Sequence, residues 1–286
     1  MGTNARSTGM RVLFVSAFVS GAFGSTGRAD ASATYSDQTL ADALWEVVPS
    51  QPGGRGWFVS AFEAAGGNTG SCKRLLTYVE PAPSAAARSI VIVVHLLDGA
   101  VYSPVASGPI ATIDYSEDAM VSASSSGGQM TGPAIRQGSH MYIALGASTG
   151  AVSGWHGVVS NGLTAASFVW VDPNDAHDGI DPAYHPDFSA TAAPIELGFF
   201  RAQMGELGGA AMWVDARIDN VSISVNAPSC TADLNSDGLI NTADLIRILA
   251  RFGQSVSGGD PTDITGDGVV NTADLVQLLV RFGQSC

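Results

Sequence analysis

The chain contains very little lysine: Lys73 is the single example among its 286 residues. Lysine and arginine together number 13 against 26 aspartate and glutamate residues, so the formal net charge at pH 7 is −13. A protein that binds nucleic acid needs a basic patch or stripe to neutralise phosphate groups. The sequence has no such stripe, which excludes a nucleic-acid partner.

Long apolar runs are also missing. A membrane-spanning helix needs about 20 consecutive apolar residues, and the run at residues 12–23 is shorter. This run follows Arg6 and Arg11 and precedes candidate cleavage sites at 29–31 and 31–33, with an earlier alternative at 22–24, as in a secretory signal peptide. We expect residues 1–33 to be a signal peptide. The protein would then be secreted, extracellular or associated with the cell surface, with no membrane span.

The most specific pattern lies in the last 57 residues, where one loop-and-helix unit occurs twice, thirty residues apart. Oxygen donors at loop positions 1, 3, 5, 9 and 12, a carbonyl at position 7 and glycine at position 6 form the calcium-loop pattern. The first set of predicted metal ligands is Asp233, Asn235, Asp237, Asn241, Asp244 and the carbonyl of Leu239. The second set is Asp263, Thr265, Asp267, Asn271, Asp274 and the carbonyl of Val269. We expect one calcium ion per loop, and weaker binding in the second because a hydroxyl at position 3 is a poorer ligand.

Each loop runs into a predicted helix that has apolar residues at helical spacing. These are Leu245, Ile248, Leu249 and Phe252 in the first copy and Leu275, Leu278, Leu279 and Phe282 in the second. Neither helix can bury this face alone, so the two should pack on each other. So small a core rarely suffices by itself, and we expect calcium binding to be coupled to folding.

The two repeats resemble a type I dockerin, over residues 230–286. The resemblance implies a small α-helical module with pseudo-twofold symmetry, two structural calcium ions and a helix face that docks onto a cohesin-like protein module. The positions that match the recognition residues of the family are Thr242, Ala243, Arg251, Thr272, Ala273 and Arg281. Because they are identical in the two copies, docking in two orientations is expected. For the two arginines, a solvated position or a contact with the helix C-terminus stays an equal alternative.

Cysteine is scarce as well, with three residues. Packing around a twofold axis would bring the two ends of the module together, so a disulfide between Cys230 and Cys286 is expected, as suits an oxidising compartment. Two free thiols remain the alternative. Cys72 would then be unpaired, and we expect it to behave as a small buried hydrophobic residue.

Residues 34–225 have the pattern of a mainly β domain. Short apolar or alternating runs are separated by Gly, Pro, Asn and Asp. The expected strands are 56–62, 74–80, 89–96, 109–114, 141–147, 166–171, 194–203 and 211–225, and residues 40–48 alone appear helical in pattern. This favours a jelly-roll-like β-sandwich, joined by a linker at 226–229 to the module at 230–286.

Residues 217–225 resemble the last strand of jelly-roll carbohydrate-binding and concanavalin-like modules, and residues 62–63 resemble an early strand. The resemblance implies a third structural ion, between Glu63 and Asp219, for which solvated carboxylates are the alternative. Trp155 lies in a Gly- and Ser-rich turn and is the first candidate to stack on a sugar ring. The polar loop 172–182, with His185 and Asp187 just beyond it, and the carboxylates of 114–118 are further candidates for ligand binding; for the loop, a merely solvated surface is the alternative.

Several catalytic motifs are absent, among them a His-Glu-x-x-His helix, a phosphate loop and the Glu-x-Asp-x-x-Glu strand of jelly-roll glucanases. We therefore expect a secreted non-catalytic protein that docks onto a cohesin-like partner, with a sandwich that binds polysaccharide during polysaccharide breakdown. Two alternatives stay open. One is a glycoside hydrolase or polysaccharide lyase, and the other is an extracellular structural or adhesion protein without a cohesin partner.

Overall fold

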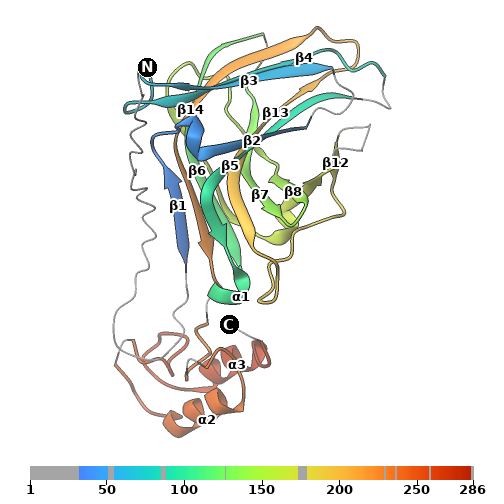
Figure 1. Cartoon of the computed structure of the whole chain (residues 1–286). Coiled ribbons are helices and arrows are strands. Elements are labelled where there is room, and N and C mark those ends of the chain that lie inside the picture. Colours follow the sequence, from blue (N-terminus) through green and yellow to red (C-terminus); the bar gives the residue numbers. More distant parts are fainter. Residues whose placement is uncertain are drawn as a thin grey trace, which may run out of the picture.

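The computed structural model describes residues 32–50, 55–84, 88–125, 127–172, 179–228, 230–235, 237–257 and 259–284. These residues form two antiparallel sheets and a small C-terminal helical part, which Figure 1 places beyond the end of the sheets where α1 (Pro104–Ser107) lies. The prediction of a mainly β sandwich is confirmed. None of the described helices is long and apolar enough to cross a membrane.

The described part of the six-stranded sheet has the order β10-β6-β14-β4-β3. β4 pairs with residues 212–218 of β14, and β1 pairs with residues 221–225 of the same strand. Its strands are β1 (Ala33–Asp37), β3 (Gly56–Glu63), β4 (Cys72–Val79), β6 (Thr112–Ser124), β10 (His156–Leu163) and β14 (Met212–Asn226). β1 begins at Ala33, the last residue of the expected signal peptide; residues 1–31 of that segment lie outside the described residues.

The described part of the eight-stranded sheet has the order β12-β11-β8-β7-β13-β5-β2, and β9 pairs with β7. Its strands are β2 (Trp45–Ser50), β5 (Ser89–Tyr102), β7 (Met130–Gln137), β8 (His140–Ala144), β9 (Ala147–Ser148), β11 (Phe168–Val171), β12 (Ile180–Asp181) and β13 (Ile195–Gly205). β5 is apolar and buried on both faces over its first half, as a covered strand should be.

The main core lies between the two sheets and includes Tyr115, Phe168 and Phe199. An ion pair crosses this core: both N–H groups at the tip of Arg201 on β13 donate to the carboxylate of Glu117 on β6, each at 3.0 Å. The two side chains are almost completely buried. A buried pair of this kind is costly to break because one charge would remain unpaired.

The prediction of a helix at residues 40–48 is wrong. The segment contains one 3-10 turn, η1 (Asp42–Leu44), and then β2, which pairs with β5. Leu40 has φ +50°, which a regular helix does not allow. The indole N–H of Trp45 donates to the carboxylate of Asp37 at 2.8 Å, which fixes the turn into the strand.

The C-terminal part contains α2 (Thr242–Arg251) and α3 (Thr272–Val280). They share one buried cluster, which includes Ile248 from α2 and Leu278 from α3. The prediction that the two helices pack on each other is confirmed. Only part of each apolar face is buried in this contact, because Leu249, Phe252, Leu279 and Phe282 are all exposed.

Candidate calcium loops and ligand-binding face

The two repeats begin their helices in the same way. Asn241 is the N-cap of α2, where its side chain accepts the N–H of Ala243, and the carboxylate of Asp244 accepts the N–H of Asn241 at 2.8 Å. Asn271 and Asp274 make the equivalent contacts at α3. This reciprocal capping satisfies N–H groups that have no partner within the helix.

The loops before the helices also match. The carboxylate of Asp233 accepts the N–H of Gly238 at 2.9 Å, and that of Asp263 accepts the N–H of Gly268 at 2.8 Å. Gly238 and Gly268 have φ +85° and +86°, a left-handed conformation that glycine adopts without strain. Both loops therefore turn at position 6, as the calcium-loop pattern predicts.

Position 12 is a fully buried carboxylate in each copy, Asp244 and Asp274. Burial raises the pKa of Asp274, but hydrogen bonds from the N–H groups of Asn271 and Thr265 outweigh it, so the pKa lies below its usual range. The hydroxyl of Thr265 also donates to Asp274, at 2.9 Å. In the first copy the equivalent side chain has a different partner, because the side-chain amide of Asn235 donates to the carboxylate of Asp237 at 2.7 Å.

Oxygen-only donors with three carboxylates per loop suit Ca²⁺, a hard cation. The turn at position 6 and the buried position-12 carboxylate fit this chemistry. In the described parts of the chain, however, no three His, Cys, Asp or Glu side chains lie close enough to hold a metal ion. The loop carboxylates accept backbone N–H groups, and the calcium ligand sets remain predictions.

The two repeats exchange backbone hydrogen bonds. The N–H of Ile240 donates to the carbonyl of Gln284 at 2.9 Å, and the N–H of Gly283 donates to the carbonyl of Ile240 at 2.7 Å. Thirty residues on, Val270 makes the same two bonds with Gln254 and Gly253, at 2.9 and 2.7 Å. Position 8 of each loop is thus tied to the chain that follows the other helix, as pseudo-twofold symmetry requires.

The predicted partner-binding residues lie along the outer sides of the helices. Thr242, Thr272 and Ala273 are exposed and Ala243 is partly exposed. Next to them, outward-facing apolar side chains recur at equivalent positions: Ile246, Leu249 and Phe252 on α2, and Val276, Leu279 and Phe282 on α3. We call these two sets the apolar helix faces.

The two arginines of the predicted docking surface have different partners. Arg251 forms an ion pair with Asp260 at 2.7 Å, whereas Arg281 donates to the carbonyl and the side chain of Gln277. The two copies therefore have the same residue at this position of the helix, but the contacts of that arginine differ between them. Cys286 lies outside the described residues, so the disulfide with Cys230 stays a prediction, whereas Cys72 is confirmed as a buried free thiol.

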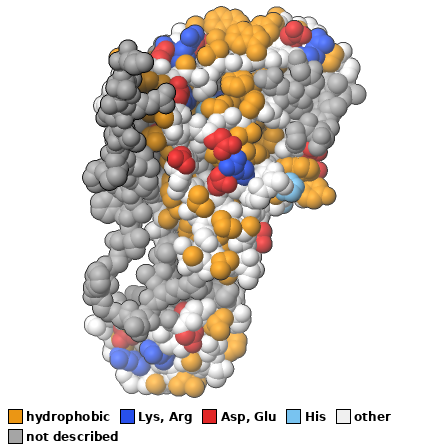
Figure 2. Space-filling model, in the orientation of Figure 1, with side chains coloured by type: hydrophobic (Ala, Val, Ile, Leu, Met, Phe, Trp, Pro, Cys, Tyr) orange, Lys and Arg blue, Asp and Glu red, His pale blue; other side chains and the backbone are white. Residues whose placement is uncertain are grey.

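On the sandwich, three aromatic side chains lie in one row on the outer face of the six-stranded sheet. Trp57 on β3 is opposite Tyr78 on β4, which is opposite Trp213 on β14. The rings of Trp57 and Tyr78 are stacked, with centroids 5.3 Å apart and an interplanar angle of 13°. Trp57 is 47% exposed and Trp213 is 37% exposed. Figure 2 shows hydrophobic side chains gathered along the edge of the molecule where Figure 1 places β3 and β4.

Ion pairs flank this aromatic row. Arg55 pairs with Glu80 at 3.1 Å on one side. On the other side Arg74 donates to both carboxylate oxygens of Asp215, at 2.7 to 3.1 Å. On this second side, farther along the strands from the aromatic row, Arg217 pairs with Glu63 at 2.6 Å. These six side chains supply hydrogen-bonding groups beside the rings and add no net charge.

The ion pair of Glu63 bears on the predicted third metal site. The structure brings Glu63 and Asp219 to the same end of the sheet, around Cys72, but the two have separate partners. Glu63 pairs with Arg217, and Asp219 accepts the N–H groups of Asn68 and Asn220, at 2.7 and 2.8 Å. Burial first, and then Glu63, raise the pKa of Cys72 to about 11, so the thiol is protonated at neutral pH.

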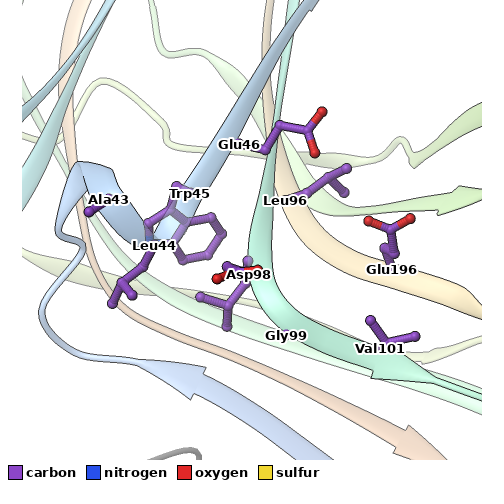
Figure 3. A pocket seen from close by; sticks show the side chains of 10 residues that line it. Ala43, Leu44, Trp45, Glu46, Leu96, Asp98, Gly99, Val101 and Glu196 are labelled. Carbon is purple, nitrogen blue, oxygen red and sulfur yellow. The ribbon is translucent and has the colours of Figure 1, made fainter. Parts of the chain in front are cut away.

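A pocket of about 470 Å³ lies at one end of the eight-stranded sheet. Figure 3 shows Glu46 on β2, Asp98 on β5 and Glu196 on β13 around it. Arg136 donates to both Glu46 and Glu196, at 2.9 and 3.0 Å. Arg136 thus holds two of the three pocket carboxylates as its ion-pair partners.

The other predicted ligand residues are not brought together. Trp155 lies in the turn before β10, and β10 is two strands from β14 in the sheet order, so Trp155 is not part of the aromatic row on β3, β4 and β14. Of the carboxylates at 114–118, Glu117 points into the core, while Asp114 and Asp118 bond Asn226 and Asn220 on the opposite face. In the polar loop, residues 173–178 lie outside the described residues, and the ring of His185 bonds the carbonyl of Phe168 at 2.7 Å.

Residues 146–150 have the Gly-x-Ser-x-Gly form of a nucleophile elbow. In that motif the serine stands on a sharp turn from a strand to a helix. Here Ser148 ends the short strand β9, pairs with Met130 and accepts the N–H of Gly150 at 3.2 Å. The match does not form a nucleophile elbow.

A scan against protein-family models gives no match, and neither does a search of curated proteins. Among solved structures, a family 11 carbohydrate-binding module from Clostridium thermocellum, in complex with a β-1,3-1,4-mixed-linked tetrasaccharide, is 12% identical. The match covers 66% of this chain and 94% of that one, with a TM-score of 0.36. A CBM22 xylan-binding domain from Paenibacillus barcinonensis is 10% identical over 68% and 94%, with a TM-score of 0.30.

A family 30 carbohydrate-binding module of a cellulosomal cellulase from Clostridium thermocellum is 12% identical over 62% of this chain and 96% of that one, with a TM-score of 0.30. TM-scores of this size do not establish a shared fold. The architecture therefore rests on the strand pairing, and the candidate site on its own side chains.

Proposed function

We propose that the protein is a secreted, non-catalytic component with two parts. Its C-terminal part is a dockerin-like module that folds around two calcium ions and docks onto a cohesin-like partner. Its β-sandwich binds a polysaccharide. The observation that carries the docking proposal is the equivalent backbone bonding of the two repeats, in which Ile240 bonds the chain after α3 and Val270 bonds the chain after α2. This bonding relates the repeats by a pseudo-twofold, and each repeat presents one apolar helix face.

Apolar side chains that stay in water on two equivalent helices support a protein-binding role. Each ion would be held by the six oxygen donors of one loop, and it would neutralise the three carboxylates gathered there. Since the module is small, calcium binding would supply part of its folding free energy.

The test uses the full chain in two steps. Isothermal titration of the chelator-treated protein with Ca²⁺ should give two ions per chain. Calcium-dependent capture from the native secretome should then recover a cohesin-like module. The double variant Ile246→Asp and Val276→Asp should keep both ions and lose the partner, which separates docking from folding. A titration that reaches no ion would overturn the proposal.

Capture of no cohesin-like module by the calcium-loaded protein would favour the structural or adhesion alternative. The enzyme alternative has its own test at the pocket in Figure 3. If the pocket were catalytic, Glu46→Gln or Glu196→Gln would abolish the release of reducing ends from a polysaccharide. We expect the unchanged protein to release none.

A further inference from the structure

The aromatic row on the six-stranded sheet is not needed by the core. Trp57, Tyr78 and Trp213 face away from the main core, and none of them belongs to a buried cluster of the described residues. Large aromatic side chains left in water usually mark a binding surface. Their alignment comes from strand register, because Tyr78 is the direct partner of both tryptophans.

The geometry of the row suits a chain of rings. Neighbouring strands lie about 4.8 Å apart, so Trp57 on β3 and Trp213 on β14, which are two strands apart, lie about 10 Å from each other and can contact different rings of one saccharide chain. Tyr78 covers one face of Trp57 and holds its ring upright. Since β3 ends the described strand order of this sheet, no described neighbouring strand covers the other face of Trp57.

The surroundings of the row indicate the kind of ligand. Sugar rings present C–H groups to an aromatic face and hydroxyl groups at their edges, so they need polar partners beside the rings. The pairs Arg55–Glu80 and Arg74–Asp215 lie on either side of the row. Because each arginine is paired with a carboxylate, the surface offers donors and acceptors with no net charge. A polyanionic polysaccharide would gain no attraction here, and the net charge of −13 would oppose it.

We infer that the row formed by Trp57, Tyr78 and Trp213 is the binding site for a neutral polysaccharide, with pyranose rings stacked on the two tryptophans and hydroxyl groups bonded to Arg74 and Asp215. The inference rests on the proposed glycan binding and assigns it to one face. Trp155 then has no part in the site.

The test measures the binding of the full chain to soluble neutral β-glucan, xylan and mannan, and to polygalacturonate, by affinity electrophoresis and titration calorimetry. Trp57→Ala and Trp213→Ala should each weaken binding to the preferred neutral polysaccharide by roughly tenfold, because each removes one stacking surface. Trp155→Ala is the matched control and should change the dissociation constant less than about twofold. Thermal unfolding of each variant checks that the sandwich is intact.

Each other outcome has a distinct meaning. If the unchanged protein binds none of the four polysaccharides, the proposed glycan binding is overturned together with this site. If it binds a neutral polysaccharide and loses it with Trp155→Ala but not with Trp57→Ala, the glycan function stands and the site is wrong. Equal binding of polygalacturonate would overturn the assignment to neutral ligands. Self-association that Trp57→Ala abolishes, in place of glycan binding, would make the row a contact between two copies and overturn the inference.

Discussion

Arg201 and Glu117 form an ion pair across the interior of the sandwich, with side chains that are 1% and 0% exposed. They belong to different sheets, so the pair links β13 to β6. Thr131 donates to the same carboxylate, at 3.1 and 3.2 Å, and Tyr115 donates to it as well. Glu117 is thus an acceptor for three side chains.

Glu117→Gln should destabilise the sandwich strongly, because it leaves the guanidinium of Arg201 buried without a counter-charge. We expect the free energy of unfolding to fall by about 3–5 kcal/mol. Urea denaturation followed by tryptophan fluorescence measures it. Glu46→Gln is the control, since Glu46 pairs with Arg136 in a much more exposed position and should cost less than about 1 kcal/mol. An equal decrease in the free energy of unfolding in the two variants would show that the buried ion pair contributes no more stability than the exposed one.

His95 should make the sandwich less stable in mild acid. Burial first, and then the charges of Lys73 and Arg201, lower the pKa of His95 well below its usual value. The folded state therefore takes up this proton less readily than the unfolded chain, in which the pKa is about 6.5. The free energy of unfolding should decrease as the pH falls below about 6.5, by up to about 1.4 kcal/mol per pH unit.

The measurement is urea denaturation at several pH values between 5 and 8. His95→Phe keeps an aromatic ring against Phe199, where His95 now stacks with centroids 4.5 Å apart. The variant should show a flatter pH dependence between pH 6.5 and 5. An unchanged slope would mean that other groups cause the acid sensitivity.

The two calcium sites should differ in affinity through one residue. Thr265→Asn gives the second loop the ligand that Asn235 supplies in the first, and it should tighten the weaker site by about tenfold. The reverse change, Asn235→Thr, should weaken the first site similarly. Asp233→Ala should lower the stoichiometry in calorimetry from two ions to one. A full two-ion titration of that variant would contradict the ligand assignment.

The predicted disulfide between Cys230 and Cys286 can be tested by counting thiols. Alkylation of the denatured, unreduced protein followed by mass spectrometry should label one cysteine, Cys72, and reduction should raise the count to three. Reduction should also destabilise the C-terminal module by about 2–4 kcal/mol. Three labelled cysteines before reduction would support the alternative of two free thiols.

Some strands could be predicted from the sequence and others could not. The strands around 56–62, 74–80 and 211–225 are confirmed, and buried and more exposed residues alternate almost regularly in the last two. β6 runs from Thr112 to Ser124, well beyond the expected strand at 109–114, and Glu117 interrupts its inward-facing apolar series of Ile113 and Tyr115. The interruption has a physical cause, because that glutamate is inward-facing and is balanced by Arg201. β7, which contains Gly132 and Pro133, has too little β propensity to be recognised in isolation.

The sequence by itself determined the repeated loops, their glycine turns and their helix caps, because these contacts join residues fewer than a dozen positions apart. Only the tertiary structure decided that Trp57, Tyr78 and Trp213 share a row, that Arg201 meets Glu117, and that Trp155 lies elsewhere. Those relations join residues up to about 150 positions apart, and they depend on strand order and register, which local spacing does not specify.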